Sequence, residues 1–274
     1  MLKYLPLLLL LSCTFALDLQ VYKPLLPFGK YPAVIILQGA NIDGEQYSMV
    51  AKKIAQYGVV VAVPDAPSIE IQPGFSMKAI TPAIVLETKA KLFSDYGNLL
   101  NGDFILLGHS YGSVIATIMA SNDAATVCST YLAPLCAGYT GFGSGLKGVL
   151  GYGLSMIDQN NNHINTNTTG VPIASLQGEL DSRTEWNNAI ISYYTLVDSP
   201  KIMFKLEGHN HYGITNSQDQ PIPDDNIQAV SQENSTSRIA LLVNLFIQSN
   251  NNAAVKSLLY NTYCSPFSVF DSHP

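Results

Sequence analysis

The chain has 274 residues, enough to bury one large hydrophobic core or two smaller ones. Its 47% hydrophobic and 12% charged residues argue against intrinsic disorder, which requires few apolar residues and many charges. The formal net charge of −6 and the lack of a Lys/Arg cluster argue against a nucleic-acid partner, because a phosphate backbone has to be neutralised by basic side chains.

Residues 1–16 have the layout of a secretory signal peptide. Lys3 gives a positive start, a run of leucines follows, and Thr14-Phe15-Ala16 resembles a cleavage site with small residues. The apolar run is too short to span a bilayer, and no later segment is long enough. We therefore expect a secreted chain of residues 17–274 without an integral membrane span. Lipid attachment at Cys13 and a buried N-terminal strand are the alternatives.

The cysteines and two glycosylation sequons fit this expectation. Removal of the signal peptide would leave three cysteines, Cys128, Cys136 and Cys264, which allow one disulfide and one free thiol without indicating the pairing. The sequons Asn167-Thr168-Thr169 and Asn234-Ser235-Thr236 predict a glycoprotein. Short sequons also arise by chance in an Asn-rich chain.

Short apolar runs alternate with longer amphipathic segments. A run of β-branched residues that ends at Gly or Pro is typical of a buried strand, and apolar residues three and four apart are typical of a helix. We expect strands at 33–39, 59–65, 103–108, 126–135, 171–178 and 201–208, and helices at 45–58, 81–97, 111–121, 183–197 and 235–248. This alternation predicts an α/β fold with a doubly wound, mostly parallel sheet flanked by helices.

One long segment interrupts the alternation. Residues 137–170 contain a glycine-rich stretch and then the Asn-rich run QNNNHINTNTTG. Because such an insertion in an α/β domain is usually a surface loop or a lid, we predict a single domain with a loop or lid here. Residues 143–148 match the dinucleotide pattern G-x-G-x-x-G, but they open no helix, so we expect no dinucleotide site.

Ser110 lies at the centre of Gly-His-Ser-Tyr-Gly, residues 108–112, between a predicted strand and a predicted helix. This is the context of a nucleophile elbow, in which the serine occupies a sharp, strained turn. The two glycines fit because a Cβ at either position would collide with the neighbouring helix or strand. We therefore predict that Ser110 is a nucleophile rather than a polar turn residue.

A serine hydroxyl needs a base to accept its proton, and His209 and His211 are the candidates. Both follow the last predicted strand, and sites of α/β proteins form at the carboxyl ends of strands. His109 is adjacent to the serine and would point away from it, so we expect it to pack or to hydrogen-bond. The His-x-His spacing could instead bind a metal, but no further ligand follows at a useful spacing.

The third member of a triad should be an acid between the serine and the histidine in sequence. Asp181 follows a predicted strand and has Glu179 close by. Asp65 also ends a strand, but it precedes the serine, so we expect it to be a turn or cap residue. Trp186, shortly after Asp181, could contact a substrate or pack in the core.

Ser110 in GHSYG, Asp181 in QGELD and His211 in GHNHYG together resemble the α/β-hydrolase superfamily, over about residues 20–248. Residues 31–65 are similar to the branch of chlorophyllases, dienelactone hydrolases and cutinase-like polyester hydrolases. In that branch an apolar strand ending in His-Gly is followed by a helix and by a second strand ending in Pro-Asp.

The resemblance implies individual roles. The family pattern G-x-x-H-(F/Y) fits residues 208–212 with His211 as the base and His209 as its neighbour, and G-x-x-D fits Asp181 as the acid rather than Glu179.

The resemblance also implies an oxyanion hole made by the backbone N–H groups of Tyr111 and Ala40. Gln38-Gly39 stands where the family has His-Gly, which leaves the geometry of this loop open. The implied activity is hydrolysis of carboxylic esters, small or lipid-like, through an acyl-enzyme and without a cofactor or a metal. A peptidase or an acyltransferase could use the same triad, and an inactive hydrolase fold could be a binding module.

Overall fold

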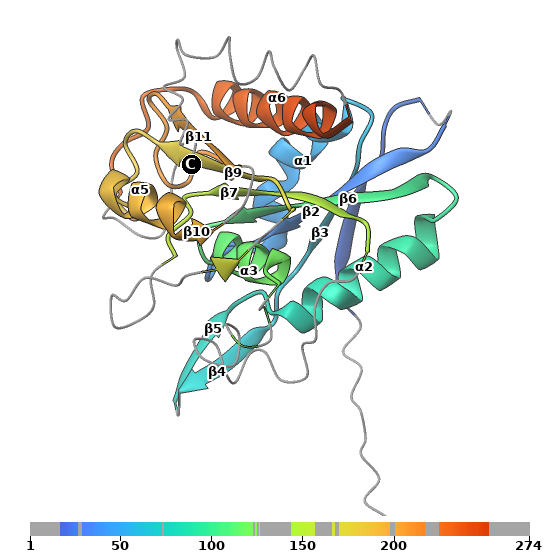
Figure 1. Cartoon of the computed structure of the whole chain (residues 1–274), viewed down its shortest axis with the longest axis horizontal. Helices are drawn as coiled ribbons and strands as arrows, with labels where there is room; N and C mark the ends of the chain where they lie inside the picture. Colours follow the sequence, from blue (N-terminus) through green and yellow to red (C-terminus); the bar gives the residue numbers. More distant parts are fainter. Residues whose placement is uncertain are drawn as a thin grey trace, which may run out of the picture.

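A seven-stranded sheet forms the centre of the molecule (Figure 1). The computed structural model describes residues 17–26, 29–72, 74–122, 124, 126, 144–156, 166–167, 170–197, 201–216 and 225–251. The strands of the sheet, in spatial order, are β1 (Leu19–Tyr22), β3 (Val60–Pro64), β2 (Tyr31–Leu37), β6 (Leu100–His109), β7 (Leu146–Tyr152), β9 (Ile173–Gly178) and β11 (Lys201–Leu206). Strand β1 pairs antiparallel with β3, and the other neighbours are parallel. The predicted α/β fold with a mostly parallel sheet is confirmed.

Helices cover both faces of this sheet (Figure 1). They are α1 (Ser48–Ala55), preceded by the 3₁₀ turn η1 (Gly44–Tyr47), α2 (Pro82–Tyr96), α3 (Tyr111–Ala120), α5 (Trp186–Thr195) and α6 (Gln232–Asn251). Helices α1 and α6 lie on one face, and α2 and α3 lie on the other. Among the helices of the described residues, none has the length and apolar character that crossing a membrane requires.

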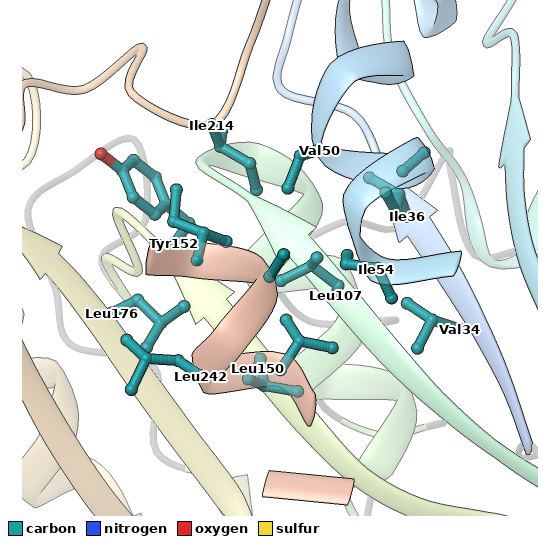
Figure 2. Close-up of a cluster of buried hydrophobic side chains, with 14 of the residues drawn as sticks. Val34, Ile36, Val50, Ile54, Leu107, Leu150, Tyr152, Leu176, Ile214 and Leu242 are labelled. Carbon is teal, nitrogen blue, oxygen red and sulfur yellow. The ribbon is translucent and has the colours of Figure 1, made fainter. Parts of the chain in front are cut away.

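The core consists of two layers because successive side chains of a strand point to opposite faces. In β2, Ala33 and Ile35 pack toward α2 and α3, whereas Val34 and Ile36 pack toward α1 and α6. Figure 2 shows the second layer, in which Leu107 of β6 lies among aliphatic side chains of α1 and α6. Full burial of one such side chain stabilises the fold by ~1.5–3 kcal/mol. The continuous burial explains why the strands read as unbroken apolar runs.

Strand β7 (Leu146–Tyr152) contradicts part of one prediction. It lies inside residues 137–170, which we expected to be a loop or a lid, and it is paired on both sides within the central sheet. Its glycines do not mark a loop. A Cβ at Gly148 would be 2.5 Å from a ring carbon of Phe246, and Gly151 is pressed against α3. Close packing on both faces therefore gives this central strand a loop-like composition.

Three further β-structures were not predicted. They are the edge strand β1, the hairpin of β4 (Ser68–Gln72) with β5 (Phe75–Lys78), and the short parallel pair of β8 (Thr166–Asn167) with β10 (Leu196–Val197). Several predicted features lie outside the described residues: the signal peptide, residues 127–135 of the strand predicted at 126–135, residues 137–143, 157–165 and 168–169 of the predicted lid, and Cys128, Cys136 and Cys264.

Candidate active site

Ser110 occupies a strained turn between β6 and α3. Its φ of 50° and ψ of −118° lie outside the regions that L-residues favour, and among the described residues only Asn41 shares a positive φ without being glycine. Such strain costs of order 1–3 kcal/mol and persists only where neighbours enforce it. One of these neighbours is the end of β7, because the Ser110 N–H donates to the Tyr152 carbonyl oxygen at 2.8 Å.

The glycines that flank Ser110 are required by close backbone contacts. A Cβ at Gly108 would be 2.4 Å from the Ser113 Cα, and a Cβ at Gly112 would be 2.3 Å from the Leu37 carbonyl oxygen. The tight turn therefore presses the start of α3 against the carboxyl end of β2. This is the geometry expected of a nucleophile elbow.

His211 and Asp181 form a buried pair at the same edge of the sheet. His211 Nδ1 lies 2.9 Å from Asp181 Oδ2, and their side chains are 6% and 0% exposed. Because a carboxylate accepts, Nδ1 is the donor, and the neutral form of the ring then has its lone pair on Nε2. His211 lies in the turn after β11 and Asp181 in the turn after β9, so two parallel strands bring them together.

Four donors surround the Asp181 carboxylate. Oδ1 accepts the backbone N–H groups of Arg183 at 2.9 Å and Thr184 at 2.7 Å. Oδ2 accepts from Gln177 Nε2 at 3.2 Å in addition to His211. This pattern of hydrogen bonds fixes the orientation of the carboxylate.

Gly153, directly after β7, lets the backbone pack closely against the side chains of His211 and Asp181. Its φ is +61°, and a Cβ there would be 3.0 Å from His211 Nδ1 and 3.2 Å from Asp181 Oδ2. Gly153 also follows Tyr152, whose carbonyl oxygen holds Ser110. The turn that carries Ser110, His211 and Asp181 therefore meet around the end of β7.

Asp225 is a second acid at the site, and sequence reasoning missed it. Its Oδ2 accepts the His211 backbone N–H at 2.7 Å, and its Oδ1 accepts the N–H and the hydroxyl of Ser182, each at 3.0 Å. Asp225 thus connects His211 to Ser182, the residue that follows Asp181. No strand end or motif marks Asp225 in the sequence, so only the fold identifies it.

The other acids and the other candidate histidine have different partners. Glu179 pairs with Lys205 at 2.8 Å, and this hydrogen bond lowers the pKa of its carboxyl. His209 is fully buried, and its Nδ1 faces the Glu207 carbonyl oxygen at 3.0 Å. Neither side chain is joined to His211 by a hydrogen bond among the described residues. Trp186 packs with Ala189 and Met203 of the core.

Gln38 stands where the family that the sequence resembles has His, and its side chain stabilises the turn after β2. Its Nε2 donates to the Ile42 carbonyl oxygen and to Asp65 Oδ1, both at 3.2 Å. Its Oε1 accepts the Ala66 N–H at 2.9 Å. Asp65 also accepts the Gly44 N–H at 2.9 Å, so it is a turn residue as predicted. The buried amide therefore joins the turns that follow β2 and β3.

The turn after β2, residues 38–44, is the loop predicted to carry an oxyanion donor, and we call it the oxyanion loop for that prediction. It leaves the Ala40 N–H open. The Gly39 N–H donates to the Tyr47 hydroxyl, and the Asn41 N–H donates to the Lys78 carbonyl oxygen at 2.9 Å. Within the described part of the chain, the Ala40 N–H has no protein acceptor. Tyr111, the first residue of α3, has a backbone N–H that helix geometry leaves without an intrahelical acceptor.

His109, the last residue of β6, is fully buried and hydrogen-bonded through both ring nitrogens, as expected. Burial lowers its pKa well below the usual value, and the nearby His211 lowers it further. Burial also lowers the pKa of His209. Both rings are therefore neutral in the folded protein at pH values where unfolded histidines begin to bind protons.

We expect the free energy of unfolding to fall as the pH decreases below about 6.5, the pKa of an unfolded histidine. Below this pH the two histidines bind protons in the unfolded chain but not in the folded protein. The free energy of unfolding therefore falls by up to about 1.4 kcal/mol per pH unit for each ring. Urea unfolding at pH 7.5, 6.5 and 5.5 measures this slope, and H109Q should reduce it. A stability that stays constant or rises toward pH 5.5 would contradict the prediction.

Among the described residues, no three His, Cys, Asp or Glu side chains come together as ligands for a metal ion. Residues 144–145 lead into β7 and residues 146–148 belong to it, so this stretch lacks the helix start that the dinucleotide pattern requires. Comparison with known proteins adds no assignment: no protein-family model matches the chain, and a search of curated proteins returns no match.

Proposed function

We propose that the protein is a serine hydrolase of the α/β-hydrolase type that cleaves carboxylic esters, with Ser110, His211 and Asp181 as its catalytic triad. The observation that carries the proposal is the buried His211–Asp181 pair. It packs at the end of β7, and the same strand end accepts the N–H of Ser110 in its strained turn. A strained serine at the carboxyl edge of a parallel sheet with an oriented imidazole nearby is what acyl transfer requires.

In the proposed reaction, Ser110 Oγ attacks the ester carbonyl carbon while His211 Nε2 takes the hydroxyl proton. The tetrahedral intermediate collapses, the carbon–oxygen bond of the ester breaks, and the alcohol leaves with the proton from His211. Water then attacks the acyl-enzyme by the same route and releases the carboxylic acid. Asp181 holds His211 in the tautomer with the proton on Nδ1 and stabilises the imidazolium.

The backbone N–H groups of Tyr111 and Ala40 are the proposed donors to the oxyanion. Leu37 and Gly108 are register partners in β2 and β6, so the two turns that carry these donors leave the sheet side by side. Removal of one such donor in other hydrolases costs about 3–4 kcal/mol of transition-state stabilisation. Because both donors belong to the backbone, Gln38 in place of His does not remove either of them.

We further propose that the protein is secreted and glycosylated. The signal-peptide layout of residues 1–16 supports secretion. Of the sequon asparagines, Asn234 is exposed in the first turn of α6, where a glycan would extend into solvent. A small or lipid-like ester remains the proposed substrate class.

Hydrolysis of p-nitrophenyl esters of increasing acyl length tests the proposed function. We expect S110A to lower kcat about 10⁴-fold or more, because the residual rate then depends on binding and the oxyanion hole alone. Ser237, exposed on α6, provides the control, and S237A should retain the wild-type rate. Equal rates for S110A and wild type would refute the proposal, and absence of any hydrolysis by wild type would favour a binding module.

A further inference from the structure

We propose that His109 and Tyr47 are positioning residues that couple the oxyanion loop to the general base through one buried chain of hydrogen bonds. This inference rests on the proposed function and deepens it. The chain runs from the Gly39 N–H to the Tyr47 hydroxyl, then to the His109 ring, and ends at the His211 carbonyl oxygen.

The distances show that every link is a hydrogen bond. Gly39 N lies 2.8 Å from Tyr47 Oη, Tyr47 Oη lies 2.8 Å from His109 Nδ1, and His109 Nε2 lies 2.9 Å from the His211 carbonyl oxygen. Tyr47 and His109 are both fully buried, so water does not compete for these bonds.

The direction of each bond follows from the two ends of the chain. The His211 carbonyl oxygen can only accept, so His109 Nε2 carries the proton. In a neutral imidazole Nδ1 then accepts, so the Tyr47 hydroxyl donates to it and receives the Gly39 N–H on its oxygen. A protonated His109 would leave the Tyr47 hydroxyl proton without an acceptor. One arrangement therefore satisfies every group, and it requires neutral His109.

The packing around His109 reinforces this coupling. Its ring centroid lies 4.9 Å from that of His211 and 5.9 Å from that of Tyr47. A Cβ at Gly39 would be 3.0 Å from His109 Nδ1, so the oxyanion loop rests directly on the ring. His109 is thus wedged between the loop proposed to bind the oxyanion and the turn that carries the base, while its own backbone leads into Ser110.

The hydrogen-bond chain gives His109, the residue before the proposed nucleophile, a positioning role. A shift of the Gly39 amide would move Ala40, and a shift of the His211 carbonyl would move the imidazole, so the chain fixes two catalytic elements relative to each other. Misplacement by about 1 Å is enough to lower a rate by about 100-fold. Loss of the chain should therefore reduce kcat more than substrate binding.

The test replaces one residue of the hydrogen-bond chain at a time and measures kcat and KM for p-nitrophenyl acetate. Active sites are counted by stoichiometric fluorophosphonate labelling. Y47F removes the donor to Nδ1 and the acceptor for Gly39 while keeping the ring. We expect Y47F to lower kcat per active site about 10- to 100-fold with KM within about twofold of wild type. Y57F, at an exposed tyrosine after α1, is the matched control and should match wild type.

Replacement of His109 provides the rescue arm. A glutamine amide can place a donor where Nε2 lies, whereas leucine cannot, so H109Q should retain at least about tenfold more activity per active site than H109L. Wild-type kcat per active site in Y47F, or equal activities of H109Q and H109L, would overturn the inference. If S110A is as active as wild type, the proposed function itself fails, and the two failures are thereby distinguished.

Discussion

Replacement of Asp181 by Asn should lower kcat for p-nitrophenyl esters about 10⁴-fold, with little change in KM and in folding. The change keeps the size of the side chain and replaces one oxygen by an NH₂ group. Its effect therefore reports on the protonation of His211 rather than on packing.

The reason lies in the four donors around this carboxylate. Two backbone N–H groups, of Arg183 and Thr184, require an oxygen at the Oδ1 position. The Asn amide must then turn its NH₂ group toward His211 Nδ1, which has to become an acceptor. The proton of the imidazole moves to Nε2, the atom proposed to take the proton of Ser110, and the base is lost.

Glu179 supplies the matched control for this experiment. It lies two residues before Asp181 but pairs with Lys205 instead of a histidine. E179Q should therefore change kcat by less than about threefold, since an exposed ion pair contributes little. A normal rate in D181N together with a collapse in E179Q would show that the acid is assigned to the wrong residue.

Replacement of Gly112 by Ala should destabilise the protein by about 3 kcal/mol or more. The added Cβ would lie 2.3 Å from the Leu37 carbonyl oxygen, 2.6 Å from that of Gln38 and 2.7 Å from the Leu37 carbonyl carbon. All three atoms belong to the backbone of β2 and its turn, so no side chain can rotate to make room. Relief requires α3 to move away from the sheet, which also distorts the elbow.

Urea unfolding of G112A measures this cost, with G170A as the control. Gly170 has a φ of +83°, and no atom of the described residues lies within 4 Å of an added Cβ. G170A should therefore cost only what a left-handed backbone costs an L-residue, about 1–2 kcal/mol. If G112A costs no more than G170A, the turn is less constrained than its contacts indicate.

The sequence predicted the features of the fold that depend on local pattern. Runs such as Ala33 to Leu37 are apolar throughout because both faces of a parallel sheet are covered. Their short length, their β-branched residues and the Gly or Pro that ends them identify them as buried strands. Strand β7 was missed because Gly148 and Gly151 are dictated by contacts with distant residues, which a local reading takes for loop composition.

For the candidate site, strand ends were the informative signal. Ser110, Asp181 and His211 each follow a strand, so their proximity could be expected from the sequence. Asp225, Tyr47 and Gly153 could not be predicted, because their contacts depend on how turns from separate strands meet.

The most direct test of the central claim, that Ser110 is a nucleophile activated by His211, is labelling of the intact protein with a fluorophosphonate, followed by mass spectrometry of the peptides. A strained serine with an adjacent base displaces fluoride, whereas an ordinary serine does not react at a comparable rate. We predict one label per chain, on Ser110, with labelling abolished in S110A and slowed at least about 100-fold in H211Q. Labelling on another residue, or equal labelling of wild type and S110A, would contradict the assignment of Ser110.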